Sequence, residues 1–283
     1  MADEPIFERA PGEKNEDNRS RLNIFFGVFT RKFWKLVTIN FMFLLFNLPA
    51  VVISYFLSTL LVMLFMPEAG ISAEEFALLV MYSGFPTVMF FMAVPLITVG
   101  PAQAGLTYLM RCFSYEMPTF DWSDFKDKMK ENMKQGILAS LINLFVLLFL
   151  LLDLYLYPKV SDGNALFSVA NGLMIIVFIL FLMASLYIYP MMVTYRLRLR
   201  DIYKNAVLFA LARFVPNLAV LILCFLVIIG PTLIFSATSS GIVLGLIYIY
   251  YLSLGFTLPG LIINFMINPA MDKYLNRTKQ GGE

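Results

Sequence analysis

The sequence contains no histidine among its 283 residues, and only 14% of its residues carry a charge. Histidine is the commonest metal ligand and the usual general base in enzymes. Its absence excludes His-based acid–base catalysis, His-ligated haem and nearly all catalytic zinc sites. A soluble domain carries about 25% charged residues, nearly twice the share found here. Both absences argue against an ordinary soluble enzyme.

Cysteine is almost as scarce, since the chain has only Cys112 and Cys224. Two residues in different settings do not form a disulfide framework or a thiolate metal cluster. No phosphate-binding loop, dinucleotide fingerprint, nucleophile elbow or metal-ligand spacing is present. The acidic residues between positions 116 and 131 alternate with lysines, which predicts a charge-paired helix face. We therefore expect no catalytic residues, no metal, no cofactor and no nucleic-acid partner, and hence no enzyme.

What the sequence has in excess is apolar residues, which make up 60% of it and include 28 phenylalanines and 17 methionines. A soluble fold of this length cannot bury so much apolar surface, so the lipid bilayer is the expected solvent. The first thirty residues are polar and lack the features of a secretory signal. We expect residues 1–30 to form a cytoplasmic arm, residues 31–271 a membrane domain, and residues 272–283 a cytoplasmic tail.

Six apolar runs are long enough to cross a bilayer, because a spanning helix needs about 20 apolar residues. The predicted spans cover residues 33–66, 76–110, 136–157, 169–195, 207–235 and 241–266. The first two runs are too long for one straight helix across a hydrocarbon core of about 30 Å. Prolines mark the expected breaks: Pro49 in the first run, and Pro86, Pro95 and Pro101 in the second. We expect the second span to end near Val99 and a new helix to begin at Pro101.

Lysine and arginine lie on alternate connections between these spans. They precede the first span, follow the second, fourth and sixth, and are absent from the other connections except for Lys159. By the positive-inside rule, this pattern places both termini in the cytoplasm and makes the number of spans even. We expect an all-α, multi-pass protein of the cell membrane. A short amphipathic cytoplasmic helix is predicted between the second and third spans.

Two segments suggest an internal repeat. Residues 130–138 read "KENMKQGIL" and residues 200–208 read "RDIYKNAVL", with basic, acidic, amide and small residues at matching positions. Pro95, Pro190 and Pro259 each interrupt an apolar run of a returning span. One interpretation is three helical hairpins in the same orientation, as in repeat-built transporters. The other is that any helix starting in the cytoplasm opens with lysine and small residues.

Polar residues inside the predicted spans are mostly neutral. Hydrogen bonds between helices are expected of the asparagines Asn40, Asn47, Asn143, Asn171, Asn217 and Asn264. Asp153 and Arg213 lie near the span ends, where we expect them at the interface rather than in a proton relay. Two clusters of tyrosines, at positions 187 and 189 and at positions 248, 250 and 251, either line a path for a sugar or fill the bundle core.

The stretch "VPLITVGPAQAGLTYLMRCF" (residues 94–113) concentrates small residues between two apolar runs. A phosphate loop would follow a strand, and a selectivity filter needs several copies around a pore. Gly100 and Ala104 are four residues apart, as are Pro101 and Gly105, so each pair gives a helix a smooth side for close packing. We expect a packed helix joint that turns the second span into the cytoplasmic segment.

This stretch, followed by "WSDFKDKMKENMKQG" (residues 122–136), resembles the YesL-like family of bacterial polytopic membrane proteins. The resemblance covers about forty residues, and it marks as candidate interaction residues Gly100, Pro101, Ala104, Gly105, Arg111, Asp124, Phe125 and Lys134. Members of this largely uncharacterised family are often encoded beside carbohydrate ABC importers and glycan-breakdown genes. The resemblance therefore implies a role in carbohydrate uptake, with ABC-importer subunits as partners.

Three functions are compatible with these observations. The first is a non-catalytic accessory or regulatory component of carbohydrate uptake, and the second is a small permease for a neutral solute such as a sugar. The third is a site for a lipid headgroup or phosphorylated sugar at residues 100–111. A helix beginning at Pro101 offers free amides, but Arg111 lies some 15 Å further along the axis and cannot share one phosphate with them. The sequence predicts no particular substrate or oligomeric state.

Overall fold

The computed structural model describes residues 20–65, 72–160, 165–238 and 241–280. Within these ranges the chain is helical and contains no strand, so the predicted all-α fold is confirmed. Five helices there are long and apolar enough to cross a membrane, and a sixth span results if one bent pair counts as a single crossing. The prediction of six spans agrees with the larger of these numbers.

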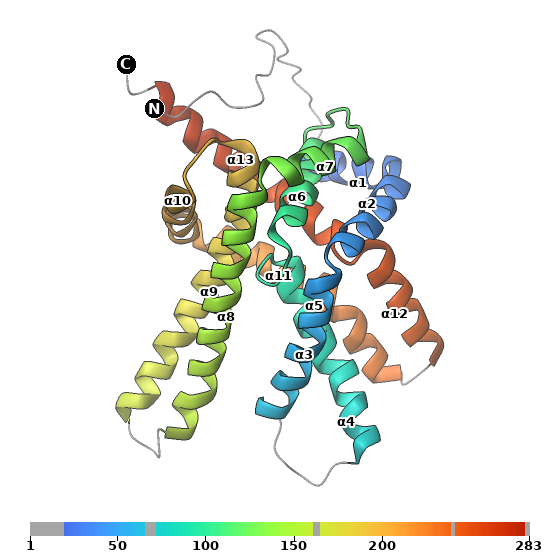
Figure 1. Cartoon of the computed structure of the whole chain (residues 1–283), viewed down its shortest axis with the longest axis vertical. Coiled ribbons are helices and arrows are strands. Elements are labelled where there is room, and N and C mark those ends of the chain that lie inside the picture. Colours follow the sequence, from blue (N-terminus) through green and yellow to red (C-terminus); the bar gives the residue numbers. More distant parts are fainter. Residues whose placement is uncertain (1–19, 66–71, 161–164, 239–240, 281–283) are drawn as a thin grey trace.

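The helices form three hairpins joined at one end of the molecule. The first half of the chain contains α1 (Arg21–Arg31), α2 (Phe33–Phe46), α3 (Leu48–Phe65), α4 (Ala73–Leu79), the π-helix η1 (Val80–Gly84), α5 (Phe85–Ala93), α6 (Gly100–Ser114) and α7 (Asp121–Glu131). The second half contains α8 (Met133–Val160), α9 (Ala165–Thr194), α10 (Leu199–Ala212), α11 (Phe214–Thr238), α12 (Gly241–Leu254) and α13 (Thr257–Gln280). The hairpins α3–α4, α8–α9 and α11–α12 point the same way, whereas α1, α6 and α7 lie at the opposite end (Figure 1).

Several predicted spans are divided by breaks. The run 33–66 consists of α2 and α3, separated at Asn47, and Pro49 is the second residue of α3, where its missing N–H is harmless. The run 76–110 ends its spanning part with α5 at Ala93, and α6 begins at Gly100, close to the break expected there. The amphipathic helix expected after it is α7.

The last two predicted spans differ more from the structure. The run 207–235 starts inside α10 and is broken at Arg213. It looked continuous in the sequence because the apolar residues at the end of the amphipathic helix α10 are followed directly by those of the membrane helix α11. The run 241–266 is a pair, α12 and α13, bent by 53°. Helix α13 continues to Gln280, so the tail expected from residue 272 begins within a helix. The arm likewise contains α1, while residues 1–19 and 281–283 lie outside the described residues.

The chain enters each hairpin through the same local arrangement. An amphipathic helix, one non-helical residue and an outgoing helix recur as α1–Lys32–α2, α7–Asn132–α8 and α10–Arg213–α11. The register differs from the one read in the sequence, since residues 130–138 contain the break at Asn132 whereas residues 200–208 lie inside α10. Pro190 also differs from Pro95, because α9 continues through it without a break.

Buried asparagines form hydrogen bonds with the backbone of the non-helical segment between α5 and α6. Asn47 accepts a hydrogen bond from the Val99 N–H at 2.7 Å, and Asn143 donates to the Pro95 carbonyl at 3.1 Å. Backbone that leaves the helical pattern inside a membrane protein needs such partners, because no water is present to provide them. The hydrogen bonds expected of Asn47 and Asn143 are therefore present, whereas Asn264 donates within its own helix to the Gly260 carbonyl and Oδ1 of Asn171 has no partner among the described residues.

The break between α12 and α13 is bonded through a single side chain, that of Asn40. Its Oδ1 accepts from the N–H groups of Phe256 and Thr257 at 2.9 and 3.1 Å, and its Nδ2 donates to the Leu252 carbonyl at 2.7 Å. Asn217 does the same for the α10–α11 break by donating to the Phe209 carbonyl at 3.0 Å. Tertiary contacts thus hold the broken helices in one geometry.

Candidate functional site

Helix α6 lies at the centre of the joint between the hairpins. It contacts α2, α7, α8, α9 and α13, and among its fifteen residues only Tyr108 is not buried. Pro101 occupies the first turn, where proline is preorganised for helix initiation. The candidate stretch of residues 100–111 is therefore a packing element rather than an exposed loop.

The small residues of α6 admit the backbone of two neighbouring helices. A Cβ atom added to Gly100 would lie 1.8 Å from the Gly136 carbonyl oxygen of α8. A Cβ atom added to Gly105 would lie 2.8 Å from the Phe125 carbonyl oxygen of α7. Ala104 is fully buried between these contacts. The close packing expected here is present, and the Gly136 backbone covers Gly100 at the start of α6.

The second part of the candidate set is only partly joined to the first. The Phe125 side chain is fully buried, and its ring lies 5.7 Å from that of Phe46. Asp124 accepts a hydrogen bond from the Phe120 N–H at 2.9 Å and so closes the first turn of α7. Lys134 is exposed on α8 and does not join this group. Gly100, Gly105 and Phe125 are thus brought together, whereas Lys134 is not.

Arg111 forms the polar centre of the joint. Its Nη2 lies 3.0 Å from one carboxylate oxygen of Asp272 on α13 and 3.1 Å from the other. Asp272 also accepts hydrogen bonds from the hydroxyls of Tyr195, at 2.7 Å, and Tyr115. We call these four residues the Asp272 cluster. It connects the end of α6, the segment after α9 and the interior of α13.

The electrostatics of the Asp272 cluster favour a clamp over a reactive site. Burial raises the pKa of Tyr115 and of Tyr195, and the negative charge of Asp272 raises both further. Both hydroxyls therefore stay protonated near neutral pH and donate to the carboxylate. The carboxylate accepts hydrogen bonds from three donor groups, and the cluster contains no serine, cysteine or lysine. Among the described residues, Nη1 of Arg111 has no hydrogen-bond partner.

Three members of this cluster were not predicted from the sequence. Asp272 was assigned to a tail, and Tyr115 and Tyr195 were not singled out. One signal was available, because Asn264, Asn268 and Asp272 follow each other at intervals of four and so share one helix face. In the structure Asn268 donates to the Asn264 side chain at 3.1 Å, one turn from Asp272.

A second set of charges ties α1, α2 and the residue between them to α6, α7 and the loop that joins α6 to α7. Lys32 lies 4.0 Å from the centre of the Phe113 ring, Lys35 forms an ion pair with Asp121 at 3.1 Å, and Arg31 pairs with Glu116. Burial lowers the pKa of Lys32, and the positive charge of Lys35 lowers it further. We call this end of the molecule, formed by α1, α6 and α7, the cap.

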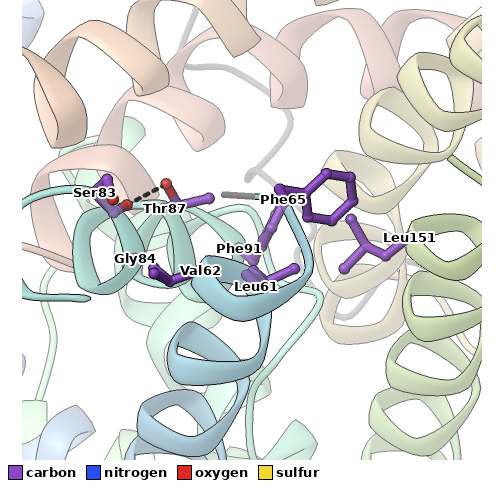
Figure 2. Close-up of a pocket in the computed structure, with 8 residues that line it drawn as sticks. All are labelled: Leu61, Val62, Phe65, Ser83, Gly84, Thr87, Phe91 and Leu151. Carbon is purple, nitrogen blue, oxygen red and sulfur yellow. Dashed lines mark hydrogen bonds between the residues drawn. The ribbon is translucent and has the colours of Figure 1, made fainter. Parts of the chain in front are cut away.

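An apolar cavity of about 240 Å³ lies in the membrane part of the molecule. Figure 2 shows its lining by Leu61, Val62, Phe65, Ser83, Gly84, Thr87, Phe91 and Leu151. Its two hydroxyls are bonded within their own helix, Ser83 to the Leu79 carbonyl and Thr87 to the Ser83 carbonyl. The cavity therefore offers an apolar surface and no convergent polar groups for a sugar.

Of the five tyrosines considered either for a sugar path or for the bundle core, three form hydrogen bonds to neighbouring helices, whereas the Tyr189 hydroxyl has no hydrogen-bond partner among the described residues. Tyr187 donates to Asn217 at 2.6 Å, Tyr250 to the Val227 carbonyl at 3.0 Å, and Tyr251 to the Ile228 carbonyl at 2.7 Å. These hydroxyls connect helices to each other. Within the described ranges, no three Asp, Glu or Cys side chains gather in a way that would hold a metal ion.

A comparison of the chain with protein-family models, curated proteins and solved structures finds no match. The resemblance to the YesL-like family therefore rests on the residues quoted above and stays a prediction.

Proposed function

We propose that the protein is a non-catalytic, multi-pass membrane protein that serves as an accessory subunit for carbohydrate uptake, with both termini in the cytoplasm. The distribution of lysine and arginine supports this orientation, because the basic connections all join the cap end of the molecule. The family resemblance suggests the partner, an ABC-type importer of carbohydrates.

The observation that carries the proposal is the exposure of the α8–α9 hairpin. Only 11% of the residues in the most apolar window of α9 are buried inside the chain, against 50% for the span Ala73–Ala93. Val169, Leu173 and Ile176 are exposed and recur at helical spacing, so they lie on one face of α9. This face is available to a helix of another membrane protein.

The polar groups of the joint favour the same function. The Asp272 cluster and the asparagines at the breaks are engaged with one another and with backbone, so they stiffen the cap instead of meeting a solute. Helix α9 is the least buried of the five candidate spans, which supports a subunit that docks through this membrane helix.

Co-purification in mild detergent tests this proposal. We expect the full chain, extracted from its native membrane, to retain membrane subunits of a carbohydrate importer. Replacing Leu173 and Ile176 by tryptophan should reduce that recovery, while the same change at the equally lipid-exposed Leu60 should not. A chain that elutes alone under conditions that preserve known importers would overturn it.

A second candidate function is passage of a neutral solute. It is favoured by the two interrupted returning helices, α5–α6 and α12–α13, because transporters commonly bind substrates where helices are broken. Uptake of a labelled sugar by vesicles that contain the protein tests this function. Uptake equal to that of protein-free vesicles would exclude solute passage.

A further inference from the structure

A second cavity, of about 280 Å³, lies between α13 and the corner where α10 meets α11. It is lined by Arg213, Met266, Pro269, Ala270, Lys273 and Tyr274. The residues from α13 recur at intervals of three and four, so one face of this helix forms a wall. The Tyr274 ring packs edge-on against Phe209 of α10, with 5.7 Å between ring centres, which closes one side. Its volume is close to the lower limit for small-molecule pockets.

The charge in this cavity is positive, and no described acidic residue balances it. Arg213 and Lys273 line it, and no acidic residue does. Among the described residues neither cation forms an ion pair. Asp272, the next residue along α13, is engaged by Arg111 and two tyrosines instead. The Arg213 side chain lies beside the Tyr187 hydroxyl, which limits its freedom to turn away.

The position of the cavity indicates where its anion would come from. Arg213 is the residue immediately before α11, whose membrane-spanning part begins at Phe214. Phe214, Val215 and Met266 are exposed apolar side chains around this point. A phosphate in the cavity would therefore lie at the edge of the apolar surface, with room for acyl chains along α11. A free anion would gain nothing from that apolar surround.

We propose that this cavity binds the phosphate group of an anionic phospholipid through Arg213 and Lys273. Basic pockets between membrane helices at the cytoplasmic side are suited to anionic headgroups. The site lies away from the exposed face of α9, so its occupancy is independent of the proposed accessory role. Bound lipid would fill the groove between α13 and the α10–α11 corner and stabilise the break at Arg213.

The test measures lipid binding to the full chain in neutral detergent by native mass spectrometry and by thermal unfolding. Three probes are added in turn: phosphatidylglycerol, phosphatidylcholine with the same acyl chains, and glycerol 3-phosphate. We expect phosphatidylglycerol to bind and stabilise most, and glycerol 3-phosphate to leave the unfolding temperature unchanged. Equal effects of both lipids would overturn the proposal, and stabilisation by glycerol 3-phosphate alone would assign the cavity to a soluble phosphate ester instead.

Charge variants locate the site. We expect R213Q/K273Q to weaken phosphatidylglycerol binding about 30-fold, as the loss of two basic residues from an anionic headgroup predicts. The control R200Q/K204Q removes the same charge from exposed positions on α10 and should leave binding unchanged. K273Q alone changes an exposed residue and should weaken phosphatidylglycerol binding about fivefold. This single variant tests the site if the double variant does not fold. Equal losses in the two double variants would contradict a specific site.

Discussion

Replacing Asp272 by asparagine would leave the buried guanidinium of Arg111 without a counter-charge. The Arg111 side chain is 7% exposed and that of Asp272 24%, so water screens the pair weakly. Removing one partner of a buried ion pair costs about 3–5 kcal/mol. Because Asp272 retains some access to water, we expect a loss near the lower limit, about 3 kcal/mol, or roughly a hundredfold in the unfolding equilibrium constant. Reversible unfolding in mixed micelles measures this difference.

A second substitution separates the ion pair from the packing around it. The variant R111M/D272L removes both charges and should lose less stability than D272N, because no unpaired charge remains buried. Tyr195→Phe removes one donor to a charged acceptor and should cost about 1.5–3 kcal/mol. If D272N is as stable as the parent protein, or the double variant is the least stable of the set, the cluster does not act as a clamp.

Three further predictions concern the joint and its breaks. Gly100→Ala should lower the free energy of unfolding by more than about 3 kcal/mol in the same assay, because its Cβ would overlap the Gly136 carbonyl. The control Gly172→Ala, whose Cβ meets no atom within 4 Å, should be neutral or stabilising. Asn40→Ala leaves two buried N–H groups unpaired at the α12–α13 break and should lower the free energy of unfolding by about 2–4 kcal/mol. A loss of stability no larger than that of an alanine substitution at an exposed position would contradict the bridging role of Asn40. Burial raises the pKa of Cys112 to about 11, so the native chain should label with maleimide at pH 8 far more slowly than the chain unfolded in dodecyl sulfate, and equal rates would refute the buried position.

Sequence patterns were sufficient for the membrane helices and for some of their breaks. An apolar run of about 20 residues has one stable form in a bilayer, so α8 and α9 were placed close to their observed limits. Prolines located the break before α6, because a proline in the first turn of a helix is favourable. Pro190 shows that a proline alone does not predict a break, because α9 continues through it.

The polar contacts of the candidate site depend on how distant helices dock. Arg111 and Asp272 are separated by 161 positions, and their pairing requires α13 to extend past the predicted membrane boundary. Pro259, in the first turn of α13, marked the break after α12, but no sequence signal identified its partner Asn40, which bonds to backbone more than 200 positions away. Periodicity predicts which face of a helix is polar, but it does not identify the partner of that face.

Site-specific photocrosslinking in native membranes tests the accessory role most directly. A photoreactive amino acid at Ile176 of α9 is compared with one at Leu60 of α3, since these residues are 53% and 52% exposed and lie on different hairpins. We expect Ile176 to yield a covalent product with a membrane subunit of a carbohydrate importer, and Leu60 to yield none. If Ile176 gives the same products as Leu60, or crosslinks lipid alone, the exposed face of α9 is not a docking surface and the proposed function is wrong.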